Sequence, residues 1–256
     1  MAERARLERD GDLGVLVIDN QPLNLFDAEM VRDILAALDA TEGCRALLVR
    51  AEGKYFTGGV DVNAFKGLSE SNGTQLTADL LAITHRMEEL PFPTLASVQG
   101  LCLTAGLELS LACDMIWAAE SAQFGLVEAV SGLTPLMGGT QRVAERAGPA
   151  RARELVMSGG LYDAATLERW NVVNRVLADE DLAASSVRFA QRLAAGPTRA
   201  HHATKRVVRA FLEHGVRGAD DATAAIGAPL FETSDLRQAV ETFLAEGPGK
   251  ATFEGS

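Results

Sequence analysis

Residues 99–114 constrain the fold of this chain more than any other stretch, because they are small or apolar almost throughout. Glu108 is the only carboxylate side chain within residues 100–113. The small residues before it and the apolar run after it predict a tight turn that feeds a buried helix starting near Thr104 or Ala105. Glu108 then lies one turn inside this helix, near the end where backbone N–H groups lack a helical partner.

A carboxylate in such apolar surroundings resists ionisation, so we expect the pKa of Glu108 to be raised. Free N–H groups and a carboxylate at one helix end suit chemistry on a carbonyl group that becomes an oxyanion. The alternative is a structural carboxylate that is satisfied by a buried partner, and this stretch alone leaves both interpretations open.

The rest of the chain predicts an α/β fold, since short apolar runs alternate with helical patterns. Asp27 is a good N-cap for the first helix, and residues 74–90 predict the second. The order strand, helix, strand favours parallel pairing with helices covering the faces of the sheet. Buried strands are expected at residues 13–18, 45–50, 94–98, 114–119 and 171–176.

The pattern becomes helical from about residue 179 onward. We therefore place a boundary near residue 195, between an α/β core (residues 1–195) and a C-terminal helical segment (residues 196–256). The late helices are expected at residues 179–195, 197–215 and 219–245, with a break near residues 227–229.

Charge and cysteine usage narrow the classes of function. A net charge of −11 argues against binding to nucleic acid or anionic membranes, although a local basic pocket could still hold a small anion. Cys44, Cys102 and Cys113 lack metal-type spacing and are expected to be reduced core residues. The charged N-terminus lacks the apolar core of a signal peptide, so a soluble, cytoplasmic protein is expected.

Glu128 is a second isolated carboxylate, and it is the only charged residue within residues 122–141. Glu108 and Glu128 each follow one of two successive predicted strands, so their side chains could converge on one pocket. Either carboxylate alone would more often be structural, but the two together favour a paired acid/base site.

Two further segments have open interpretations. The Gly58-Gly59 pair predicts a turn that presents bare N–H groups to a ligand, or an ordinary glycine-rich turn; it matches neither a P-loop nor a dinucleotide fingerprint. The basic segment at residues 199–209 forms either a solvated helix face or a site for an anionic ligand. His201 and His202 within it point to different sides of a helix, so no shared metal is expected.

Taken together, these stretches resemble the enoyl-CoA hydratase/isomerase family, also called the crotonase family. The resemblance covers nearly the whole chain, and it implies an α/β, crotonase-like spiral of ββα turns with a C-terminal helical segment. Residues 20–24 resemble the first CoA-contact loop, 56–61 the first oxyanion segment, 99–114 the central signature, 122–142 the segment that follows, and 231–253 the C-terminal helices.

The resemblance also implies a reaction, the syn addition of water to a trans-2-enoyl-CoA to give a 3-hydroxyacyl-CoA. The two backbone N–H donors to the thioester oxygen fall on Val60 and Ala105. The two carboxylates fall on Glu108, as the base toward water, and Glu128, as the proton donor to the α-carbon. No metal or redox cofactor is implied, because CoA is part of the substrate. Implied contacts to the acyl-CoA thioester are Gln21, Leu23, Val60, Asp61, Val62, Ala105 and Lys250.

The chain departs from the family pattern at three places. Val60 stands where alanine is commoner, and Thr104-Ala105 replace a Gly-Gly pair; both changes keep the backbone donors but narrow the pocket. Residues 245–250 replace the usual Glu-Lys-Arg, although Lys250 could still reach a CoA phosphate, across a subunit interface if necessary.

The resemblance further implies a homotrimer or hexamer, with residues 196–256 as the trimerisation segment, and a place in fatty-acid or related acyl-CoA metabolism. Two alternatives stay open. Double-bond isomerisation on the same scaffold usually needs one carboxylate, so the presence of two favours hydration. An acyl-CoA binding protein without turnover would result if Val60 and Ala105 crowd out the catalytic water.

Overall fold

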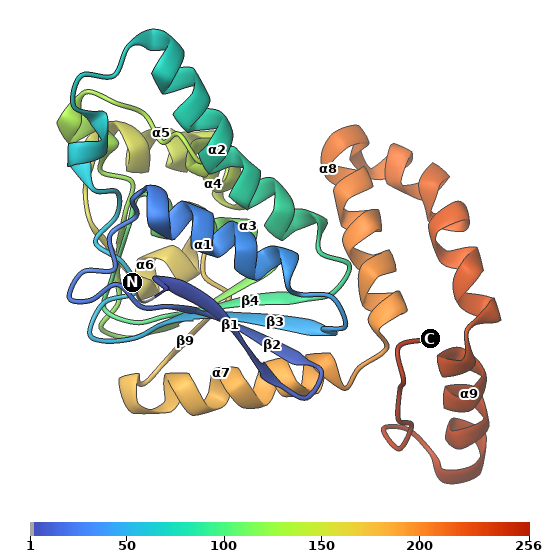
Figure 1. Ribbon diagram of the computed structural model, residues 1–256. Coiled ribbons are helices and arrows are strands. Elements are labelled where there is room, and N and C mark those ends of the chain that lie inside the picture. Colours follow the sequence, from blue (N-terminus) through green and yellow to red (C-terminus); the bar gives the residue numbers. More distant parts are fainter. Residues whose placement is uncertain (1–2) are drawn as a thin grey trace.

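A computed structural model describes residues 3–256 and has a six-stranded sheet at its centre (Figure 1). β1 is antiparallel to β2, and every later neighbour in the sheet is parallel. In spatial order the strands are β1 (Ala5–Asp10), β2 (Leu13–Ile18), β3 (Ala46–Ala51), β4 (Thr94–Val98), β6 (Met115–Ala119) and β9 (Arg175–Leu177).

A second, three-stranded sheet carries the segments that lead to the two isolated carboxylates. It consists of β5 (Leu101–Leu103), β7 (Gln123–Gly125) and β8 (Tyr162–Asp163). β5 leads directly into α3 (Ala105–Ala112), and β7 leads into the short helix η2 (Glu128–Ser131). Because β5 and β7 are parallel neighbours, both exits lie at the same edge of this sheet.

Helices cover both faces of the main sheet. α1 (Ala28–Asp39) and α2 (Glu70–Glu89) lie on one side and α7 (Asp179–Ala194) on the other (Figure 1). The parallel strands β2 and β4 are therefore buried along their whole length, which explains why neither strand contains a charged residue. The remaining core helices are η1 (Val62–Phe65), α4 (Gly139–Ala147), α5 (Pro149–Ser158) and α6 (Ala164–Arg169).

The C-terminal helices project away from the sheet (Figure 1). They are α8 (Thr198–Gly227), η3 (Ala228–Glu232) and α9 (Ser234–Glu246), and α8 is interrupted at Gly215, where φ is 70°. Arg45 in the core donates to Thr198 Oγ1 at 2.9 Å and to the carbonyl of Gly196 at 2.7 Å, which ties the start of α8 to the sheet. The end of α8 at Gly227 confirms the predicted helix break, while the division at residue 195 stays a prediction.

Most predicted strands are confirmed, but the last is wrong in position. Residues 171–174 form a turn instead of a strand, and β9 begins only at Arg175. Asn171 has φ 63°, and the N–H groups of Asn171 and Val172 donate to carbonyls of α6 at 2.9 Å. Val172 and Val173 are buried although they belong to this turn. Their apolar side chains therefore suggested a buried strand that the structure does not contain.

The three cysteines are buried and free, as the sequence predicts. Within residues 3–256, none of the helices has the combination of length and apolarity that crossing a bilayer requires.

Candidate active site

Glu108 lies in the first turn of α3, and its side chain is almost fully buried, with 2% exposed. Its Oε1 accepts hydrogen bonds from the backbone N–H groups of Met137 and Gly139, both at 2.8 Å. Burial raises the pKa of Glu108 to about 7, although the two N–H donors act in the opposite direction. The sequence-based expectation of a raised pKa is therefore confirmed, and the carboxylate also has buried partners.

The turn that holds Glu108 depends on two glycines and on Arg142. A Cβ at Gly139 would lie 2.8 Å from Glu108 Cγ, so only glycine allows this approach without a shift. Gly138 has φ 96°, and its carbonyl accepts a hydrogen bond from Arg142 at 3.2 Å. Arg142 is buried and donates from Nε and a terminal nitrogen to the two carboxylate oxygens of Glu88, at 2.7 and 2.8 Å.

Arg142 was not predicted as a site residue. In the sequence, Arg142 stands at the end of the segment 122–142, four residues after Gly138. This position does not reveal that its side chain bonds to the carbonyl of that glycine. The ion pair between Arg142 and Glu88 joins α4 to α2 across 54 residues of chain. It also orients the guanidinium group of Arg142 toward the carbonyl of Gly138. Arg142 thus supports the turn whose N–H groups hold Glu108.

Glu128 is the first residue of η2, and burial raises its pKa to about 6. Its Oε2 is buried and accepts no hydrogen bond from residues 3–256. The charge of Glu128 also contributes to the raised pKa of Glu108, which places the two carboxyl groups within electrostatic reach of each other. The charge of Glu128 thus acts on Glu108, while a pocket shared by the two carboxylates stays a prediction.

Val60 and Ala105 lie on two segments that meet beside Thr104. The N–H of Val60 donates to Thr104 Oγ1 at 3.0 Å. Ala105 is the first residue of α3, and its N–H finds no acceptor among residues 3–256. Of the two predicted oxyanion donors, the N–H of Ala105 is thus free of protein partners. The N–H of Val60 is bonded to a side-chain hydroxyl, and this contact was not predicted from the sequence.

The loop that contains Gln21 and Leu23 packs against the segment that contains Val60. The N–H of Gly58 donates to the carbonyl of Leu23 at 2.7 Å, and Phe26 forms an isolated bridge with Val60. Buried Asn24 joins the loop to the residues after β3, since its side-chain amide donates to the carbonyls of Glu52 and Tyr55, both at 2.9 Å. The predicted contact loop and the first oxyanion segment therefore form one unit.

The other predicted contact residues occupy different settings. Leu23 and Val62 present apolar side chains that are 40% and 61% exposed. Asp61 caps η1, and the backbone N–H of Asn63 lowers its pKa. Lys250 lies in the exposed segment after α9. Gln21 is exposed at the tip of its loop.

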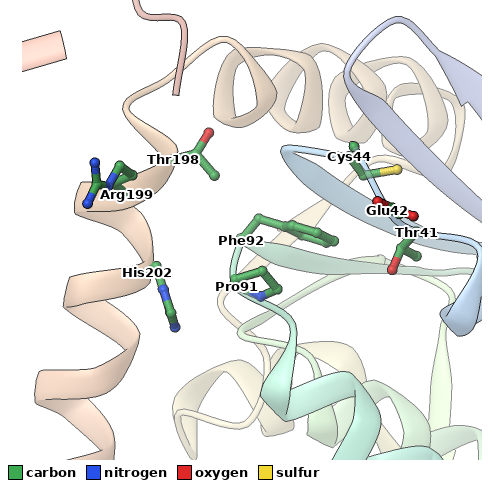
Figure 2. Close-up of a pocket in the computed structure, with 9 residues that line it drawn as sticks. Thr41, Glu42, Cys44, Pro91, Phe92, Thr198, Arg199 and His202 are labelled. Carbon is green, nitrogen blue, oxygen red and sulfur yellow. The ribbon is translucent and has the colours of Figure 1, made fainter. Parts of the chain in front are cut away.

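Two cavities of the described chain lie elsewhere, between the core and α8. The smaller, of about 360 Å³, separates Arg199 and His202 on α8 from Pro91 and Phe92 on the core (Figure 2). The larger, of about 820 Å³, follows α8 further along. Neither is lined by Glu108 or Glu128, so neither belongs to the candidate active site.

The basic segment at residues 199–209 is partly neutralised by carboxylates. Lys205 pairs with Asp114 at 3.0 Å, and Arg209 pairs with Glu213 at 3.0 Å. These pairs favour the structural interpretation of the segment over an anion site. No cluster of His, Cys, Asp and Glu suited to a metal ion occurs in the part of the chain that the structure describes.

Comparison with known proteins agrees with this arrangement. The chain is 31% identical over 256 residues to a probable enoyl-CoA hydratase of Rhizobium meliloti, with 98% of each chain covered. It is 32% identical over 200 residues to an enoyl-CoA isomerase/hydratase of Mycosarcoma maydis, covering 78% of this chain and 73% of that protein.

The fold is shared with solved structures as well. The crystal structure of "Enoyl-CoA Hydrates Subunit I" from Geobacillus kaustophilus superposes with a TM-score of 0.92 at 29% identity, over the full length of both chains. A profile of the family described as enoyl-CoA hydratase/isomerase matches residues 8–255. With its α/β core, its two coupled carboxyl groups and this match over nearly its whole length, the chain belongs to the enoyl-CoA hydratase/isomerase, or crotonase, family.

Proposed function

We propose that this protein hydrates trans-2-enoyl-CoA thioesters by syn addition of water, giving 3-hydroxyacyl-CoA products. The observation that carries the proposal is the pair of coupled carboxyl groups, whose pKa values are raised to about 7 at Glu108 and about 6 at Glu128. Between these values the pair carries one proton. A one-proton pair suits a reaction in which one carboxyl group takes a proton from water and the other gives one to carbon.

In the proposed reaction, the water oxygen bonds to the β-carbon while Glu108 accepts a proton from that water. Glu128 gives its proton to the α-carbon, so the product gains the elements of one water molecule. Glu108 ends protonated and Glu128 ionised, and proton exchange with solvent restores the starting state. The C=C π bond is the only carbon–carbon bond that is lost, and no oxidant or reductant takes part.

Hydrogen bonding supports this division of roles. Two N–H donors at 2.8 Å favour the ionised form of Glu108, whereas Glu128 Oε2 has no donor among residues 3–256 and is suited to carry the proton. The order of the two pKa values alone would place the shared proton on Glu108. The proposed reaction starts from the arrangement of the pair in which the proton lies on Glu128, and the two N–H donors lower the cost of ionising Glu108.

Charge that develops on the thioester oxygen needs donors at fixed positions. The N–H of Ala105 is free of protein acceptors in residues 3–256, whereas that of Val60 donates to Thr104 Oγ1. We assign these N–H groups to the oxyanion site. Gln21, Leu23, Asp61 and Val62 line the adjoining loops and are proposed to contact the CoA portion of the substrate, with Lys250 toward a CoA phosphate.

Assembly into a homotrimer or a hexamer is part of the proposal. It is supported by the large apolar side chains that the C-terminal helices leave exposed, because exposed apolar side chains gathered on one element often mark a surface that packs against a partner. They are Val208, Phe211, Leu212 and Val216 on α8 and Val240, Phe243 and Leu244 on α9. A cytoplasmic location and a role in fatty-acid or related acyl-CoA metabolism complete the proposal, with no cofactor other than the CoA of the substrate.

The decisive test is the loss of enoyl-thioester absorbance when the purified protein is mixed with crotonyl-CoA. Activity that disappears in Glu108→Ala and in Glu128→Gln, with binding of butyryl-CoA retained, would support hydration by both carboxyl groups. Conversion of a 3-enoyl-CoA without hydration would indicate an isomerase instead. Thermal stabilisation by acyl-CoA with no product from either substrate would indicate a binding protein.

A further inference from the structure

Thr104 has a backbone conformation that threonine rarely adopts. Its φ is 45° and its ψ is −120°, in a region that glycine enters freely and a β-branched residue enters only under strain. The surroundings hold it there, since its N–H donates to the carbonyl of Gly125 and its own carbonyl accepts the N–H of Glu108, both at 2.9 Å. Thr104 is the N-cap of α3, one turn before Glu108, and backbone strain at such a position indicates a function for its side chain.

The side chain of Thr104 reaches across to the opposite segment. Its Oγ1 accepts the N–H of Val60 at 3.0 Å, over a separation of 44 residues. Gly59 makes room for this contact, because a Cβ at Gly59 would lie only 2.2 Å from Thr104 Oγ1. Thr104 is 8% exposed, so this hydroxyl is held in a confined position.

The bond from Val60 uses only an oxygen lone pair, so the hydroxyl hydrogen is still available to donate, and no acceptor for it occurs among residues 3–256. The nearest unpaired donor along the chain is the N–H of Ala105, on the next residue. A hydroxyl that accepts one hydrogen bond becomes a stronger donor for the next. The Thr104 O–H and the Ala105 N–H therefore form a neighbouring pair of donors.

We propose that the Thr104 hydroxyl is an oxyanion donor of this enzyme: it accepts the Val60 N–H and donates its own hydrogen to the thioester oxygen. This inference rests on the proposed function, since it concerns the same acyl-CoA site. In this arrangement Val60 acts through the hydroxyl, and Ala105 acts directly. No bond is made or broken at Thr104, and only hydrogen bonds strengthen as charge develops on the thioester oxygen.

The test compares Thr104→Val, which keeps the shape and loses the hydroxyl, with Thr104→Ser, which keeps the hydroxyl. Thr104→Val should lower kcat about a hundredfold, the loss typical of one oxyanion donor, while Thr104→Ser stays within about threefold of the parent. Thr84→Val is the matched control, because Thr84 is also a buried threonine but donates only to a carbonyl within α2. Melting temperatures would confirm that each variant folds.

A second readout does not depend on turnover. Butyryl-CoA labelled with carbon-13 at the thioester carbonyl has no double bond to hydrate, and isotope-edited infrared difference spectra report hydrogen bonds to its oxygen. The bound carbonyl band should lie at lower frequency in the parent and in Thr104→Ser, and should move back toward its solution value in Thr104→Val.

The two proposals fail in different ways. A lowered carbonyl band that depends on the hydroxyl, in a protein that does not hydrate crotonyl-CoA, would support the role of Thr104 and overturn the hydratase assignment. Full hydration with the same band position and rate in Thr104→Val would overturn the role of Thr104 alone. A Thr104→Gly variant more than tenfold faster than the parent would also overturn it, since the hydroxyl would then only be blocking Val60.

Discussion

The carboxylate of Glu108 accepts a hydrogen bond from the backbone N–H of Gly139 at 2.8 Å, across 31 residues of chain. Gly139 is the first residue of α4, so the helix that follows η2 directs its first N–H at the proposed base. This contact sets both the position and the proton affinity of Glu108, and it makes the geometry of the site sensitive to a single methyl group.

Gly139→Ala should therefore impair catalysis without removing any reacting group. The added Cβ would lie 2.8 Å from Glu108 Cγ and 2.9 Å from Leu126 Cδ1, so the carboxylate must shift. A shift of about 1 Å in a reacting group costs on the order of a hundredfold in kcat. The matched control is Gly73→Ala in α2, where a Cβ meets open space. Equal kcat values in Gly139→Ala and the parent would contradict the role of this contact.

The rate of hydration should depend on pH as a narrow bell. Because the carboxyl pair works with one proton, kcat/KM should rise through an apparent pKa near 6 and fall through one near 7. Initial rates with crotonyl-CoA between pH 5 and 8.5, in buffers of constant ionic strength, would measure both limbs. A flat profile over this range would show that the two groups do not titrate in the rate-determining step.

Stability should depend on pH in the opposite sense to that of an ordinary ion-paired carboxylate. The pKa values of Glu108 and Glu128 rise from 4.5 to about 7 and about 6 on folding, so over this range the folded state binds more protons than the unfolded chain, whichever group holds the shared proton. The free energy of unfolding should therefore fall as pH rises from about 5 to about 7. Urea denaturation of Glu108→Gln, which cannot titrate at this position, should show a weaker fall than the parent shows.

Asn24 should be important for the loop that precedes the first oxyanion segment. Asn24→Ala removes the amide that donates to Glu52 and Tyr55, and we expect a loss of about 2–3 kcal/mol from buried carbonyls left without donors. Asn24 also has φ 51°, so Asn24→Gly separates the lost amide from backbone strain. Chemical denaturation of both variants, together with titration of butyryl-CoA, would test whether the loop supports binding.

The apolar runs allowed much of the core to be predicted from sequence. β2 and β4 are buried on both faces, and their short runs without a charged residue predicted buried strands. β1 escaped prediction because it is an edge strand with the sequence Ala-Arg-Leu-Glu-Arg-Asp, in which charges dominate and only Ala5 is buried. β5 is only three residues long and was hidden within the apolar run that leads to α3.

The candidate site was likewise predictable only where local composition was informative. Glu108 and Glu128 were visible because each is a lone charge in an apolar stretch, and local composition is enough to show that. The hydrogen bond from Val60 to Thr104 was not visible, because it joins segments 44 residues apart. It also depends on a backbone conformation at Thr104 that threonine seldom takes, so no local preference of the sequence could have indicated it.

The hydrogen bonds from Met137 and Gly139 to Glu108 have a consequence for how this protein could change during evolution. Gly138, which precedes α4, has no side chain to cap that helix, and the carboxylate of a different helix fills this role. A descendant that replaced Glu108 to acquire another reaction would also leave the start of α4 without its acceptor. Replacement of Glu108 should therefore lower the stability of the turn before α4 as well as remove the proposed base.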